Sequence, residues 1–74
     1  MKFTLRQLQI FLAVARHENI SRAAGSLHMS QSAASEALLN LEHTYDVTLF
    51  DRASNRLTLN AIGNTLRKEA ESLL

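Results

Sequence analysis

Three histidines are the residues that first suggest a metal site in this sequence. His17, His28 and His43 form no pair at i, i+3 or i, i+4, so none has a second imidazole within one helical turn. The chain also has no cysteine, which removes thiolate ligands and thiol nucleophiles. We therefore expect no metal and no cofactor, and histidines that are solvated or that cap helix ends.

Carboxylates and hydroxyls offer no better basis for catalysis. Glu36 and Glu42 are six residues apart, on different faces of one predicted helix, and no pocket-forming segment surrounds them. The serines between positions 30 and 35 lie near His28, but no residue is placed as an orienting acid or an oxyanion hole. We expect Glu42 to make a structural ion pair or to cap a neighbouring helix. The sequence predicts that this protein is not an enzyme.

Length and composition indicate one small, mainly helical domain. The chain has 74 residues, 46% of them hydrophobic, with few aromatic residues and no proline. A core made mainly of Leu, Ile, Val and Ala suits packed helices, and no proline interrupts them. The start of the chain does not resemble a signal peptide, and no run approaches the ~18 apolar residues of a membrane span. We expect a cytoplasmic protein without membrane contact.

Four helices are predicted, each opened by a residue whose side-chain oxygen can accept a bond from the amides of the first turn. They are Leu5 to His17 after Thr4, Arg22 to about Leu27 after Ser21, Gln31 to about Tyr45 after Ser30, and a last helix after Asn60. Each long helix has an apolar stripe at helical spacing. The stripes are Leu5, Leu8, Leu12 and Ala15, widened by Phe11; Ala34, Leu38, Leu41 and Tyr45; and Ile62, Leu66, Ala70 and Leu73. The last helix has no stop signal before Leu74, so we expect it to be truncated. Its stripe could belong to the intramolecular core, but its length beyond the second strand favours a partner helix.

Two short strands are predicted at residues 47–50 and 56–59, around a polar turn at residues 53–55. Residues 57–59 alternate apolar and polar side chains, as a half-buried strand requires. Asp46 is expected to end the preceding helix, because aspartate tolerates the left-handed backbone better than most non-glycine residues.

Two of the predicted helices are separated only by a tight turn at His28-Met29, which is the helix-turn-helix pattern. Ala23 and Ala24 in the first of them are small enough to let the second pack closely. The second helix can lie in the major groove of DNA with its N-terminal residues against the base edges. An ordinary helical bundle would show a similar pattern, and the net charge of +1 favours neither interpretation.

The residues in and around this pattern resemble the DNA-binding domain of LysR-type transcription regulators along essentially the whole chain. The matching residues are Leu5-Arg6-Gln7-Leu8 with Phe11; Ala13-Val14-Ala15; Ser21-Arg22-Ala23-Ala24 with Leu27; Ser30-Gln31 with Ala33 and Ser35; Leu41-Glu42; Leu49-Phe50 with Arg52; and Leu57-Thr58-Leu59 with Gly63. The resemblance implies a mainly α fold: a winged helix-turn-helix, with a three-helix core and a short β-hairpin wing, followed by a linker helix. It places the winged domain at residues 1–59, with the helix-turn-helix at about 19–38 and the wing at about 47–59, and the dimerisation helix at 60–74.

The function that the resemblance implies is sequence-specific binding of double-stranded DNA, at partly palindromic operators, for regulation of bacterial transcription. Members of the family act as homodimers through the linker helix and often as tetramers at full length. They carry a separate domain that binds a small-molecule effector, and that domain is not in this chain.

Matching positions suggest three groups of functional residues. Base contacts are expected from Gln31, Ser32, Ser35 and Glu36. Contacts to the DNA backbone and from the wing are expected from Ser21, Arg22, Ser30, Arg52 and Arg56. Dimerisation is expected from Ile62, Leu66, Ala70 and Leu73. For the arginines, solvation or ion pairs with Asp51 or Glu42 are the alternative.

The chain departs from the family in the second helix of the helix-turn-helix. Members of the family usually carry basic residues there, where this chain has Glu36, Leu39 and Asn40. Ser32 and Asp46 replace a usual proline and a usual glycine. Phosphates repel a carboxylate near DNA unless it accepts a bond from a cytosine amino group. We therefore expect weak non-specific binding with a shallow salt dependence. The alternative function is a winged-helix protein-interaction module with little DNA affinity.

Overall fold

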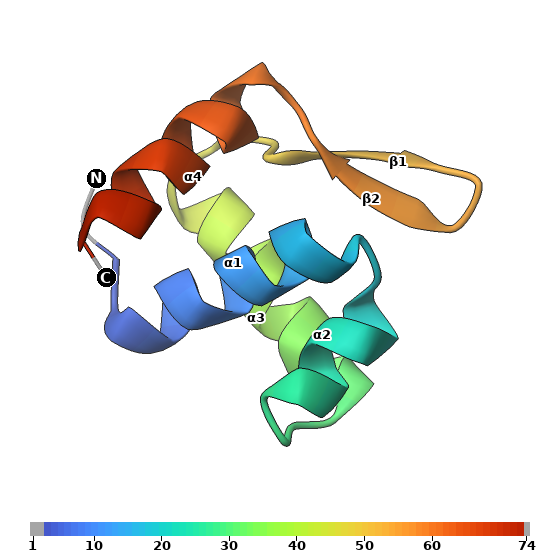
Figure 1. Cartoon of the computed structure of the whole chain (residues 1–74). Helices are drawn as coiled ribbons and strands as arrows, with labels where there is room; N and C mark the ends of the chain where they lie inside the picture. The colour runs from blue at the N-terminus through green and yellow to red at the C-terminus, as the bar shows by residue number, and fades with distance from the viewer. Residues whose placement is uncertain (1–2, 74) are drawn as a thin grey trace.

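The elements follow one another in the predicted order, in a computed structural model that describes residues 3–73. They are α1 (Leu5–His17), α2 (Ile20–Ser26), α3 (Gln31–Thr44), β1 (Phe50–Ala53), β2 (Arg56–Leu59) and α4 (Ala61–Leu73). The first three helices pack around one another, the β1–β2 hairpin projects away from them as the wing, and α4 packs on α1 and β2 (Figure 1). The predicted fold class, a three-helix core with a hairpin wing and a following helix, is confirmed.

Three of the four predicted helix caps are present. The Thr4 hydroxyl accepts from the Gln7 amide over 3.0 Å, and the Gln7 side chain accepts in return from the Thr4 amide over 2.9 Å. The Ser30 hydroxyl accepts from the third amide of α3 over 3.1 Å. The side chain of Asn60 accepts from the Gly63 amide over 2.7 Å. Each cap satisfies an amide that has no partner within its helix.

The predicted cap of α2 is wrong, because Asn19 takes the place given to Ser21. The Asn19 side chain accepts from the Arg22 amide over 2.9 Å, so α2 begins at Ile20 and ends at Ser26. Glu18 ends α1 in the left-handed conformation, and the extended Asn19 directly after it leads straight into α2. The loop between the two helices is therefore shorter than the sequence pattern indicated.

The core consists of apolar side chains, and among the described residues no polar or charged one is buried. Phe11 and Val14 of α1, Leu38 and Leu41 of α3, and Leu49 have exposed fractions of at most 1%. The predicted inner face of α3 is thus confirmed. Burial of such side chains contributes about 1.5–3 kcal/mol each to folding.

The predicted stripe of α1 is wrong at its first residue and too narrow. Leu5 is 59% exposed, whereas Ile10 and Ala13, outside the stripe, are buried. The reason is that α1 packs against α2, α3, β2 and α4. A helix surrounded on several sides buries more than the single face that an amphipathic pattern describes.

The wing is a β-hairpin whose turn has two residues, Ser54 and Asn55. β1 and β2 are antiparallel, with Ala53 opposite Arg56 next to the turn. Ser54 and Asn55 both have positive φ, at 51° and 63°. This is the mirror-image turn whose twist matches that of the flanking strands. Ala53 therefore ends β1 and is not part of the turn.

The predicted strand over residues 47–49 is wrong, since β1 begins at Phe50. The amide of Val47 donates to the Glu42 carbonyl over 3.0 Å, and the amide of Leu49 donates to the Glu42 carboxylate over 2.8 Å. These amides bond to the end of α3, so they are not available to a neighbouring strand. Glu42 is thus structural through this hydrogen bond, and within residues 3–73 it makes no ion pair and caps no helix.

α4 packs against α1 and β2 of the same chain, so part of the predicted dimer surface is buried within the domain. Leu66 and Ala70 are 4% and 0% exposed because α1 and β2 cover that face of α4. They belong to the intramolecular core and have no surface to offer a partner. Of the predicted stripe, only Ile62 and Leu73 are exposed, at 48% and 74%.

The close approach at Gly63 gives a first prediction. A Cβ at this position would lie 2.2 Å from the Leu49 carbonyl oxygen and 2.8 Å from Leu59 Cδ2. Because the first of these atoms belongs to the backbone, Gly63→Ala should lower the free energy of unfolding by about 1–3 kcal/mol, as measured by urea denaturation.

The matched control is Gly25→Ala in α2, where an added Cβ meets no atom within 4 Å. Alanine is the better helix former by about 0.5–1 kcal/mol, so this variant should be unchanged or slightly more stable. Equal destabilisation of the two variants would contradict the packing argument.

Candidate nucleic-acid interface

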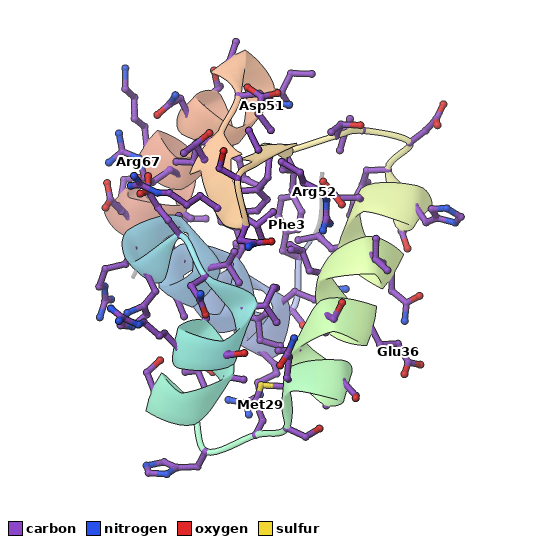
Figure 2. The ribbon with its side chains drawn as sticks, turned by 90° about the vertical axis from the view of Figure 1, so that its right-hand side faces the viewer. Phe3, Met29, Glu36, Asp51, Arg52 and Arg67 are labelled. Carbon is purple, nitrogen blue, oxygen red and sulfur yellow. The ribbon has the colours of Figure 1, made fainter. Side chains whose placement is uncertain are left out.

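The outer face of α3 is polar at its N-terminal half. The four residues predicted to contact bases lie on this face and, with Leu39 and Asn40, line one open groove, here called the α3 groove. They are Gln31, Ser32, Ser35 and Glu36. Figure 2 shows Glu36 pointing away from the body of the protein. This face points to solvent because Leu38 and Leu41, on the opposite side of the helix, are buried in the core.

A second groove lies between the wing turn and the starts of α2 and α3, and is here called the wing groove. Its lining includes four of the predicted functional residues, which come from three separate parts of the chain. They are Ser21, Gln31, Arg52 and Arg56. Gln31 lines both grooves. The outer face of α3 is therefore continuous with the wing.

A side-chain hydrogen bond orients Gln31 where the two grooves meet. The Ser21 hydroxyl donates to Gln31 Oε1 over 2.7 Å. Ser21 is free to do so because Asn19, and not Ser21, caps α2. The bond leaves both N–H groups of the Gln31 amide without a protein acceptor among the described residues, so they are available as donors.

Arg56 is held by an ion pair that the sequence analysis missed. Its guanidinium donates to the Glu18 carboxylate, and the adjacent Leu57 amide donates to the Glu18 carbonyl over 3.1 Å. The two charged side chains are 67% and 33% exposed, so the pair contributes only about 0–1 kcal/mol, but it ties the wing to the end of α1. The partners considered from the sequence, Asp51 and Glu42, do not take this place. A separation of 38 residues leaves no local pattern by which to find Glu18.

Arg22 and Arg52 are the predicted backbone-contact cations that have no carboxylate partner within residues 3–73. Both side chains are exposed. Ser30 uses its hydroxyl oxygen to cap α3, which leaves the hydroxyl hydrogen as a donor. α3 itself contains no lysine or arginine. Positive charge therefore flanks the α3 groove and does not lie in it.

The three histidines lie in separate parts of the fold. Across residues 3–73, no three or more His, Cys, Asp or Glu side chains are grouped so as to hold a metal ion. His17 ends α1, His28 follows α2, and His43 lies in the last turn of α3. In the same part of the chain, no helix combines the length and apolar character needed to cross a membrane.

A winged helix-turn-helix with an exposed, polar second helix defines a class of DNA-binding domain. Residues 5–64 of this chain match the family model of bacterial regulatory helix-turn-helix proteins of the LysR family. The chain belongs to this family. The family is one of transcription regulators and not of enzymes.

Individual relatives agree with this assignment. The transcriptional regulator CfxR of Cupriavidus necator is 45% identical over 71 residues, which are 96% of this chain and 22% of CfxR. The solved DNA-binding domain of BenM, in complex with benA site 1 DNA, superimposes with a TM-score of 0.91 at 28% identity, covering 96% of this chain and 80% of that one. The DNA-binding domain of CbnR, also in complex with DNA, has a TM-score of 0.89 at 32% identity, with coverages of 96% and 82%. The chain thus corresponds to a DNA-binding domain and spans about one fifth of the length of its curated relatives.

The bond from Ser21 to Gln31 gives a second prediction. Ser21→Ala removes the donor that holds the Gln31 carbonyl, so the Gln31 amide should rotate more freely. The measurement is ¹⁵N relaxation of the Gln31 side-chain amide. Stability should fall by no more than about 1 kcal/mol, since the bond is exposed.

Ser26→Ala is the matched control in the same helix. It also removes a serine hydroxyl, but one that donates to the Ala23 carbonyl. Gln31 should be unaffected in this variant. Identical relaxation of Gln31 in wild type and Ser21→Ala would show that the bond does not orient it.

Proposed function

We propose that this chain is the DNA-reading domain of a bacterial transcription regulator and binds double-stranded DNA by placing the α3 groove against base edges in the major groove. The observation that carries the proposal is the position of Gln31, a bidentate-capable amide that lines both the α3 groove and the wing groove. The likeness to the BenM and CbnR domains, whose solved structures are DNA complexes, supports it.

Base recognition is assigned to the residues of the α3 groove. The Gln31 amide offers the donor and acceptor pair that matches adenine. Ser32 and Ser35 carry short hydroxyls that can donate or accept and so adapt to either base of a pair. Glu36 can only accept, which suits the amino group of cytosine.

Positioning on the sugar-phosphate backbone is assigned to the residues around the two grooves. Arg22 and Arg52 are exposed cations without carboxylate partners among the described residues. Ser30 keeps its hydroxyl hydrogen as a donor, whereas Ser21, which donates to Gln31, contributes when a phosphate oxygen replaces that acceptor. Arg56 contributes when a phosphate replaces Glu18 as its partner, since both are anions that accept from a guanidinium. Such contacts fix register and orientation but carry no sequence information.

The proposed assembly is a homodimer through α4 on a partly palindromic operator, with tetramers at full length. The exposed Ile62 and Leu73 of α4 are the part of the predicted stripe that remains available to a partner. A two-fold axis would place two α3 helices on successive half-sites. The effector-binding domain of the full-length regulator would supply small-molecule control, and the protein would act in the cytoplasm, where the chromosome lies.

Selection from a random duplex library at two salt concentrations tests the proposal. We expect enrichment of an inverted repeat, with weaker recovery at the higher salt because fewer counterions are released. Recovery of single half-sites would support DNA reading but place dimerisation outside these 74 residues. No enrichment at either salt, from protein shown to be folded, would contradict the proposal and favour a protein-interaction module.

Two variants separate base readout from backbone contact. Gln31→Ala should relax the preference at one base position and weaken the enriched site by about 1–3 kcal/mol. Arg52→Ala should weaken all sequences alike and reduce the salt slope by about one. The measurement is a binding titration on enriched and scrambled duplexes over a salt series. An equal loss on both duplexes for Gln31→Ala would instead make Gln31 a backbone contact.

A further inference from the structure

We infer that Glu36 and Leu39 act together as a pyrimidine reader, which selects a cytosine and a neighbouring thymine within each half-site. The inference rests on the proposed function and deepens it, because it names part of the sequence that the domain recognises. It is carried by two exposed side chains of α3, a carboxylate and a leucine, that share the α3 groove.

Leu39 is the unusual residue of this surface. It is 48% exposed, whereas its neighbour Leu38 and the following Leu41 are 1% exposed. Leu39 lies three residues after Glu36, so both lie on the same face of α3. Both also line the α3 groove. A large apolar side chain is thus presented to whatever occupies that groove.

Among the groups that bases present in the major groove, only one makes a favourable contact with the Leu39 side chain. In the major groove, the donors and acceptors of all four bases are polar, and only thymine adds an apolar group, its C5-methyl. A leucine side chain that covers this methyl removes apolar surface of both partners from water. Against any other base it would desolvate polar atoms without bonding to them.

Hydrogen-bonding chemistry restricts Glu36 to cytosine. A carboxylate accepts hydrogen bonds only, and Glu36 has no ion-pair or hydrogen-bond partner within residues 3–73. Cytosine presents an amino donor alone, whereas adenine presents an amino donor beside the N7 acceptor, which would repel the carboxylate. Guanine and thymine present acceptors only. α3 has no lysine or arginine to offset the repulsion between Glu36 and the phosphates. Binding is therefore favoured only at sites where a cytosine amino group donates to Glu36.

The spacing of the two residues matches neighbouring base pairs. Three residues of helix advance about 4.5 Å along the axis. Successive base pairs are about 3.4 Å apart. When α3 lies along the major groove, Glu36 and Leu39 therefore reach adjacent pairs. The half-site should contain a cytosine and a thymine at adjacent pairs, at positions independent of the adenine read by Gln31.

Chemical substitution in the enriched duplex tests the thymine contact directly. Replacing the thymine by uracil removes only the C5-methyl. Loss of that methyl from an apolar contact should weaken wild-type binding about fourfold. The same replacement should leave Leu39→Ala unchanged, because the contact is already absent. Leu5→Ala, at a 59% exposed leucine of α1, is the matched control and should keep the fourfold loss.

Replacing the adjacent cytosine tests Glu36. Any other base at that position should weaken wild-type binding about tenfold, and Glu36→Ala should reduce this discrimination to less than about twofold. Glu69→Ala removes the same charge from an exposed position of α4 and should keep the tenfold discrimination. A loss of discrimination in both variants would assign the effect to net charge and overturn the inference.

The outcomes separate the inference from the function on which it rests. If the library yields no enriched duplex, the proposed function fails. If it yields an enriched duplex in which uracil replaces thymine at no cost, or in which no cytosine adjoins a thymine, the function stands and the inference is wrong. Thermal unfolding of each variant establishes that it is folded, and the uracil test on wild-type protein needs no variant at all.

Discussion

The path of the chain through Leu49 determines where the wing and α4 lie relative to α3. Its side chain is 1% exposed in the core, its amide donates to the Glu42 carboxylate at the end of α3, and its carbonyl accepts from the Asn60 amide that precedes α4. Gly63 approaches the same carbonyl from α4 and leaves no room for a Cβ. One residue thus contacts α3, the residue that caps α4, and α4 itself. A shift of this segment would move the wing away from the start of α3. The wing groove, which both Gln31 and Arg52 line, would then be lost.

The wing is fixed at its other side by Glu18. The ion pair with Arg56 is exposed and weak by itself, but the Leu57 amide bonds to the carbonyl of the same residue. The hairpin is therefore held through its backbone, while the guanidinium keeps the freedom to exchange one anion for another. This combination suits a wing that must keep its direction and still offer a cation to a phosphate.

The proposed function assigns charge and specificity to different elements. The cations proposed to meet phosphates belong to α2 and the wing, and α3 carries a carboxylate and an exposed leucine but no lysine or arginine. Phosphate contacts supply most of the affinity and its salt dependence, whereas base-edge contacts supply discrimination. With no cation on the helix proposed to face the bases, poorly matched sequences would gain little from α3. In the proposed function, Glu36 and Leu39 therefore contribute to discrimination and not to affinity.

Local signals in the sequence determined most of the fold, whereas the resemblance to the LysR family supplied the members of the candidate site. The caps at Thr4, Ser30 and Asn60 depend on residues within one turn, and so does the inner face of α3; the sequence pattern was sufficient for each of them. The exposure of Gln31 and Glu36 followed from the same periodicity. Tertiary contacts decided the rest. Val47 and Leu49 have the composition of a strand, but α3 binds their amides.

Two further outcomes depended on residues far apart in the sequence, and a third on a choice between two neighbouring capping residues. Leu66 and Ala70 have the spacing of a dimer surface, but α1 and β2 cover them in the folded chain. Ser21 is a good helix cap by type, yet Asn19 was already in the extended conformation that a cap requires, and Ser21 bonds to Gln31. The partner of Arg56 is 38 residues away. A helix period or a cap is set by neighbours along the chain and can be read from them, whereas packing partners are set by how the elements fold back on one another.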